Sequence, residues 1–158
     1  MKKMTTSLLI AIFCAIGTTA QEDVPNEIDY YQTLFGMEKQ AIVELFMSLD
    51  DPVKTEKFWD IYENYEYKRK ELGQKRLSLL IEYVTNYKTL TGIQTDDLIV
   101  KIEQQKKSMD RIIYKFYKRI RAKVGSKEAG QFYQIENLLL NSIRADVLEH
   151  MPFIGEFD

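Results

Sequence analysis

One stretch of the chain, residues 51–90, has the composition of a single very long α-helix. It contains no proline after Pro52 and only one glycine, Gly73, and its apolar residues recur at steps of three and four. A helix of about 35 residues would be roughly 50 Å long, because each residue adds about 1.5 Å. No compact core could cover so long an apolar stripe, so we expect this helix to pack against other long helices.

Helical spacing predicts three further helices in the rest of the chain. The first would span residues 28–49, with an interruption at Gly36. The third would follow a capping residue at Thr95 and stop at Gly125, and the fourth would begin at the capping residue Ser126. No stretch alternates at period two for long enough to form a strand, so the fold class is all-α.

The ends of the long second helix carry their own signals. Asp51 and Pro52 suit the start of a helix, and Gly92 suits a left-handed residue just after the end of one. The loops are short, so the helices should be antiparallel neighbours, with the two very long ones forming an extended helical hairpin. Two such helices expose more apolar surface than one small chain readily covers, which predicts a homodimer.

The first 20 residues have the pattern of a signal peptide. A positively charged start is followed by an apolar run over residues 8–16, and small residues precede a cleavage point after Ala20. The run is well short of the roughly 20 apolar residues that a membrane span needs, so export is favoured over a membrane anchor. We therefore predict a periplasmic protein made of residues 21–158, a single all-helical domain with a flexible arm over residues 21–27.

Cleavage after Ala20 would change both charge and redox chemistry. It removes the sole cysteine, Cys14, and two of the 22 basic side chains, which leaves 20 basic against 24 acidic residues. The mature chain could form no disulfide, so helix packing must stabilise it. Its mildly acidic balance argues against nucleic acid as the main partner.

The chain lacks the residue groupings that catalysis and metal binding need. His150 is the only histidine, and a position near a helix end explains it without a metal or a reaction. Paired acids such as Asp96 and Asp97 are explained by helix starts. We find no glycine-rich phosphate loop and no nucleophile with a partner base, so we predict no enzyme activity, no metal and no cofactor.

Two helix starts share an aromatic pattern, in which phenylalanine is followed by a second large aromatic residue and, two positions later, by isoleucine. The shared pattern has two equally good explanations: an internal repeat, or coincidence between two amphipathic helices. A second short pattern, Phe-x-Gln-Ile-Glu-Asn, begins at Phe132. Together these patterns single out Phe58, Trp59, Ile61, Phe132, Gln134, Ile135 and Glu136.

A capped helix start followed by an aromatic turn, twice in a small exported helical chain, resembles the periplasmic Spy/CpxP-like proteins. Their helix starts carry a Leu-Thr-x-x-Gln motif, and the counterparts here are residues 49–57 and 124–131. The first lacks the threonine and glutamine, and the second has Ser126 and Glu128 in their places. The pattern that begins at Phe132 recurs in secreted relatives of this group.

The resemblance implies an antiparallel dimer whose long helices form a shallow concave cradle. It implies an ATP-independent chaperone that binds unfolded or envelope proteins. The alternative is an envelope-stress regulator that binds the periplasmic part of a signalling protein, and a third interpretation is an interaction module without chaperone activity.

Basic residues and tyrosines form the candidate binding surface. No acid lies between Asp110 and Glu128, and a second basic group surrounds Gly73. These residues would contact unfolded chains, acidic partners or anionic lipid headgroups; the other open interpretation is a solvated helix face. For the tyrosines of the long helix, core packing is favoured over a binding face. The candidate residues are Lys68, Arg69, Arg76, Arg111, Lys115, Lys118, Arg119, Tyr65, Tyr114 and Tyr117.

Overall fold

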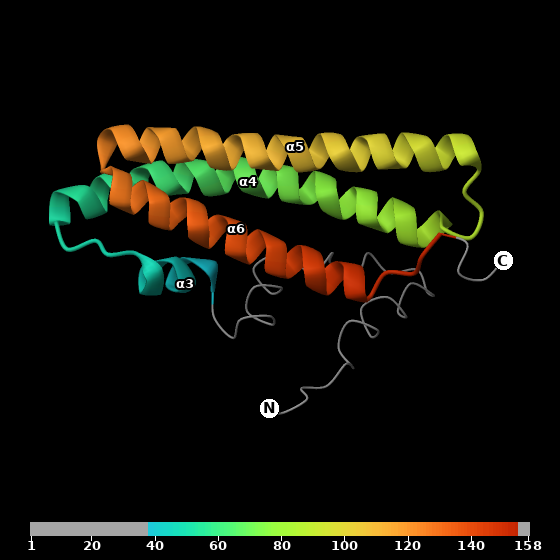
Figure 1. Ribbon diagram of the computed structural model, residues 1–158, viewed down its shortest axis with the longest axis horizontal. Helices are drawn as coiled ribbons and strands as arrows, with labels where there is room; N and C mark the ends of the chain where they lie inside the picture. The colour runs from blue at the N-terminus through green and yellow to red at the C-terminus, as the bar shows by residue number, and fades with distance from the viewer. Residues whose placement is uncertain (1–37, 155–158) are drawn as a thin grey trace, which may run out of the picture.

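The computed structural model describes residues 38–154, which form four α-helices and, within that range, no strand (Figure 1). The prediction of an all-α fold with very long helices is therefore confirmed. The predicted signal peptide, the arm and the first part of the first predicted helix lie outside the described residues. The helices are α3 (Lys39–Phe46), α4 (Pro52–Asn86), α5 (Gly92–Lys123) and α6 (Ser126–Glu149).

The start of α4 is capped as predicted. The Asp51 carboxylate accepts a hydrogen bond of 2.8 Å from the backbone N–H of Val53, and Pro52 occupies the first helical position. A proline is tolerated there because the N–H that it lacks would have no partner within the helix.

The prediction for the junction between α4 and α5 was wrong. Gly92 does not follow the end of α4, which ends earlier, at Asn86; it is the first residue of α5. Thr91 and Gln94 form a capping box, in which each side chain bonds the backbone N–H of the other residue. This box starts α5 before the predicted cap at Thr95.

The turn between α5 and α6 depends on Gly125. Its φ of 154° is the one positive φ within the described residues, and a Cβ there would lie 2.3 Å from a carboxylate oxygen of Glu128. Gly125 also stands at the N-cap of α6, so Ser126, the predicted cap, is instead the first helical residue.

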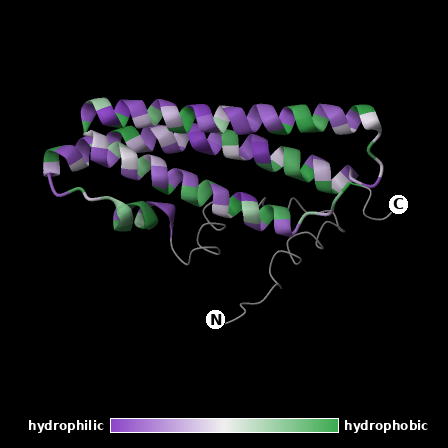
Figure 2. Ribbon diagram, in the orientation of Figure 1, coloured by the Kyte–Doolittle hydropathy of each residue, from purple (hydrophilic) through white to green (hydrophobic). Residues whose placement is uncertain are grey.

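The three long helices lie side by side, and the short α3 lies near one end of them. α4 and α5 run in opposite directions, α6 returns along them, and α3 lies beside α6 on the side away from α5 (Figure 1). Hydrophilic residues recur along α4 and α5, whereas α3 is largely hydrophobic (Figure 2).

An aromatic core lies at the end of the molecule that α3 covers. Tyr65 makes edge contacts with Phe116 of α5 and Phe132 of α6, with ring centroids 5.4 and 5.0 Å apart. Phe58 and Phe132 are buried, so the shared aromatic pattern of the two helix starts supplies core residues. Of the other pattern positions, Ile61, Ile135 and Glu136 are buried, Trp59 is partly buried and Gln134 is exposed.

Candidate functional site

Four charged side chains meet inside the fold, where α3, α4 and α6 come together. The Lys39 ammonium of α3 lies 2.5 Å from an oxygen of Glu66 on α4 and 2.8 Å from an oxygen of Glu136 on α6. Arg69 donates two hydrogen bonds to Glu66, at 2.7 and 2.8 Å. These four residues are named the buried charge cluster: Lys39, Glu66, Arg69 and Glu136.

Two tyrosines complete the surroundings of Glu136. The hydroxyl of Tyr65 donates to one carboxylate oxygen at 2.6 Å and that of Tyr62 to the other at 3.2 Å. Burial, and next the negative charge of Glu136, raise the pKa of both tyrosines well above the ordinary value of 10. Both hydroxyls therefore stay protonated and remain donors at neutral pH.

Glu66 is ionised in spite of its burial. Burial by itself would raise the pKa of this carboxyl, but the charge of Lys39 and the hydrogen bonds and charge of Arg69 outweigh it. The pKa of Glu66 falls from 4.5 to about 2. The cluster thus contains an internal carboxylate that two cations keep charged.

Two residues that were predicted to bind partners at the surface, Tyr65 and Arg69, lie in or beside this cluster. Tyr65 is fully buried and Arg69 is 5% exposed, so neither reaches the outer surface in this structure. For the tyrosines of the long helix, core packing was the favoured interpretation, and Tyr65 is such a core residue. The burial of Arg69 is explained by its hydrogen bonds to Glu66. Sequence reasoning missed Lys39 and Glu66, although the steps from Lys39 to Ile42 and Val43 place the lysine on the apolar side of its helix.

The second charged region lies on the outside of α5 and at the start of α6. Its basic residues are all exposed, and none forms an ion pair within the described part of the chain. The flanking acids turn to other helices: Asp110 pairs with Arg144 of α6 at 3.6 Å, and Glu128 pairs with Lys54 of α4 at 2.8 Å. We name this surface the basic face: Arg111, Lys115, Lys118, Arg119, Arg121, Lys123 and Lys127.

Three tyrosines line the basic face and link α5 to α6. Tyr114 and Tyr117 stack with ring centroids 5.9 Å apart, and Tyr117 meets the edge of Tyr133 at 5.8 Å. The Lys118 ammonium lies 4.9 Å from the centroid of the Tyr114 ring, and the Arg121 guanidinium 5.9 Å from that of Tyr117. These are cation–π distances, and the rings remain accessible, since Tyr114 is 54% exposed and Tyr133 is 43% exposed.

The structure thus brings six predicted surface residues together on α5: Arg111, Tyr114, Lys115, Tyr117, Lys118 and Arg119. The remaining two candidates lie on the neighbouring helix α4. Lys68 is exposed, and Arg76 is half-buried. The sequence placed Tyr133 in the aromatic pattern of a helix start but not on this surface, because its contact with Tyr117 joins two different helices.

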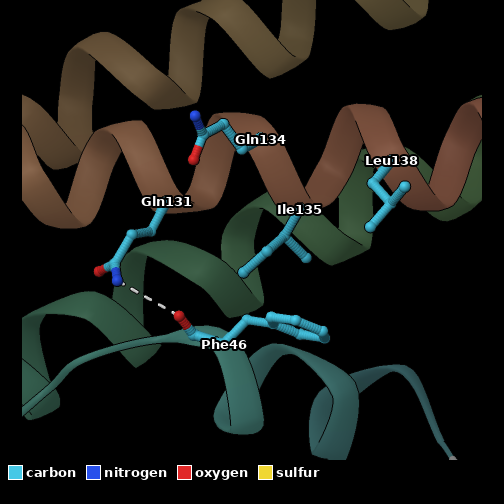
Figure 3. A pocket seen from close by; sticks show the side chains of 5 residues that line it. All are labelled: Phe46, Gln131, Gln134, Ile135 and Leu138. Carbon is cyan, nitrogen blue, oxygen red and sulfur yellow. Dashed lines mark hydrogen bonds between the residues drawn. The ribbon is translucent and has the colours of Figure 1, made fainter.

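A pocket of about 210 Å³ lies where α3 ends against α6, lined by Phe46, Gln131, Gln134, Ile135 and Leu138 (Figure 3). The Gln131 amide donates to the Phe46 carbonyl at 3.3 Å and to the Ser48 hydroxyl at 3.1 Å. The side-chain amide of Gln131 is therefore occupied by hydrogen bonds to residues at the end of α3. The remaining walls of the pocket are mainly apolar.

Residues 38–154 contain neither a candidate metal site nor a candidate membrane span. No three His, Cys, Asp or Glu side chains there lie together as a metal site would require. No helix in the same range is long and apolar enough to cross a membrane. His150 stands at the end of α6, with its Nδ1 2.7 Å from the Asp146 carbonyl oxygen.

Comparisons with protein-family models, with curated proteins and with solved structures gave no match to this chain.

Proposed function

We propose that this chain is an exported helical protein of the periplasm that binds non-native or envelope proteins as an ATP-independent chaperone. The observation that carries the proposal is the basic face: seven exposed cations without an acid among them, beside three tyrosines, of which Tyr114 and Tyr133 are exposed and Tyr117 is partly buried. The resemblance to Spy/CpxP-like proteins, and the long helices that such proteins share, support the same function.

The basic face would capture a client in two steps. Its one-signed charge attracts acidic segments and speeds encounter, more strongly at low salt. The client then settles on Tyr114, Tyr117 and Tyr133, which offer contact area at low entropic cost. Contacts of this kind are individually weak and numerous, so binding should be broad and no single residue should dominate.

The extended hairpin, its cradle and the homodimer belong to the same proposal. Large apolar side chains are exposed near the far ends of α5 and α6, where Ile93 is 85% and Leu148 is 66% exposed. A second copy could cover such residues. Light scattering at micromolar concentration should then give twice the mass of one mature chain, and a strict monomer would remove the dimer from the proposal.

The test measures how well the protein suppresses aggregation of several unrelated unfolded proteins, without nucleotide, across a salt series. Reversal of Lys115, Lys118 and Arg119 to glutamate should slow capture and flatten its salt dependence, while helicity and melting temperature change little.

A matched control separates this surface from net charge. Reversal of three exposed lysines outside both basic groups, Lys57, Lys88 and Lys106, changes the net charge equally and should retain most of the protection. Equal losses in both triple variants would contradict a role for the basic face. Tight binding to one envelope sensor without client protection would support the regulator instead, and binding only to anionic vesicles would support a membrane surface.

A further inference from the structure

α3 occupies a groove between α4 and α6 in the way that a bound peptide helix would. One side of α3 is buried in this groove through Ile42 and Val43, and its C-cap residue Met47 is buried as well, whereas Leu45 and Phe46 are 71% and 56% exposed. The floor of the groove is aromatic and aliphatic, with Tyr62, Tyr65, Phe132, Ile135 and Leu139 in the same core cluster.

The Lys39 ammonium sits in a cage that other helices provide. Two carboxylates lie within 2.8 Å of it, and the ring centroids of Tyr65 and Tyr62 lie 5.2 and 5.6 Å away. Carboxylates and aromatic rings are the groups that recognise an ammonium ion in proteins.

The cage is built without help from α3. Arg69 holds Glu66 through two hydrogen bonds, and the hydroxyls of Tyr62 and Tyr65 hold Glu136. All five side chains belong to α4 or α6, so the receptor half of the contact is oriented before the lysine arrives. A preoriented site is what recognition of a separate ligand requires.

Stability alone does not explain a buried lysine here. A buried ion pair is often no more stabilising than apolar residues of similar size, because desolvation offsets the attraction. Apolar residues in place of both the lysine and its carboxylate partners could fasten α3 equally well. The cage instead specifies which side chain enters the groove, which is a property of a binding site.

α3 also has little helical stability of its own. It has only eight residues, and its N-cap residue, Glu38, makes no side-chain capping bond. Isolated helices of this length are unstable in water. The backbone is extended at both Met47 and Asp51, the two ends of the link to α4, so α3 can leave the groove without unwinding α4.

We infer that the groove between α4 and α6 is a second binding site, that α3 is its internal occupant, and that a client helix carrying a lysine displaces α3. The client would present the pattern that Lys39, Ile42, Val43 and Met47 form: a lysine followed at the third, fourth and eighth positions by apolar residues. This site is separate from the basic face, so either site can fail its test without the other.

The experiment uses the full mature chain with α3 expelled by Val43→Asp, since Val43 is 1% exposed and a carboxylate cannot remain there. The probe is a dye-labelled helical peptide of about 15 alanine and glutamine residues, carrying lysine and the three apolar residues at the stated spacing. Fluorescence anisotropy should show binding to the Val43→Asp chain at least about tenfold tighter than to the wild type, because α3 no longer competes.

Two controls test the cage itself. A peptide with methionine in place of the lysine should bind about tenfold or more weakly, since it loses charge-assisted hydrogen bonds. Adding Glu136→Gln to the Val43→Asp chain should shrink this difference, whereas the reversal of Lys115, Lys118 and Arg119 should leave it unchanged. If Val43→Asp prevents cooperative folding, Ile42→Ala serves as the milder variant.

Three results would overturn the inference. One is equal binding of the lysine peptide and a scrambled peptide of the same composition. Another is no tighter binding to either opened variant than to the wild type. The third is self-association of the opened chain that blocks the peptide, because the occupant would then be α3 of a second copy.

Discussion

The buried charge cluster and the basic face are both built from basic residues and tyrosines, but they differ in burial and in the pairing of their charges. In the cluster, two cations meet two carboxylates from three helices, and two tyrosine hydroxyls donate to the Glu136 carboxylate. On the basic face, one stretch of α5 and the start of α6 carries seven cations beside accessible tyrosine rings. Lysine beside tyrosine is therefore an internal fastening in one region and an available surface in the other.

Two lysines make the comparison sharp. Lys39 lies 5.2 Å from the ring centroid of Tyr65, and Lys118 lies 4.9 Å from that of Tyr114. The distances are alike, but the first lysine is 7% exposed and has two carboxylates, whereas the second is exposed and has none within the described residues. Burial and pairing, and not proximity to a ring, decide how strongly each affects stability.

The largest difference should follow from removing a carboxylate of the buried cluster. Glu136→Ala leaves Lys39 buried with one partner lost, so it should lower the free energy of unfolding by about 3–5 kcal/mol. The matched change at an exposed pair, Glu103→Ala, should cost at most about 0.5 kcal/mol. Urea unfolding measures both, and similar midpoints for the two variants would mean that the cluster does not stabilise the fold.

Acid should weaken the buried cluster in a defined pH range. The folded-state pKa of Glu66 is about 2 against an ordinary value of 4.5, so its contribution is present above about pH 4.5 and is lost as the pH falls to about 2. That contribution is roughly 3 kcal/mol. Urea unfolding at several pH values should show this loss in the wild type, and Glu66→Gln should remove that part of the acid dependence.

The turn between α5 and α6, within the basic face, should also be sensitive to sequence. Gly125→Ala should destabilise by about 1–3 kcal/mol, because alanine at this φ is strained and its Cβ would displace the Glu128 carboxylate that pairs with Lys54. Gly130→Ala is the matched change inside α6, where a Cβ would meet nothing within 4 Å. It should stabilise by about 0.5–1 kcal/mol, so thermal melting should move in opposite directions for the two variants.

The smallest effect should come from a lysine of the basic face. Lys118→Ala loses one exposed cation–π contact with Tyr114, which is worth about 0.5–1 kcal/mol. Lys115→Ala, which removes an equal charge without a ring contact, should change thermal stability by less. If Lys118→Ala destabilised as much as Glu136→Ala, burial would not be the property that separates the two regions.

Local signals in the sequence predicted most of the fold. Apolar spacing and the cap at Asp51 depend on residues a few positions apart, so α4 began where expected. The junction before α5 failed because two local signals competed there: Gly92 suits the end of a helix, but Gln94 completes a capping box with Thr91.

The two charged regions differ in how far the sequence could predict them. The basic face comes from one contiguous stretch, so its charge could be read directly. The buried charge cluster joins Lys39 to Glu136, which are 97 positions apart, and no spacing rule connects them. Arg69 was consequently predicted as a surface residue, since the sequence alone does not reveal which cation meets a carboxylate from another helix.

The same separation of 97 positions sets an order of events during synthesis. Lys39 emerges from the ribosome long before Glu136, and at about 5–20 residues per second the delay is roughly 5–20 s. Throughout that interval α3 has only part of its groove to bind, and its lysine lacks one of its two carboxylate partners. The cluster closes only when α6 emerges, so the chain remains incompletely folded until most of it has been made.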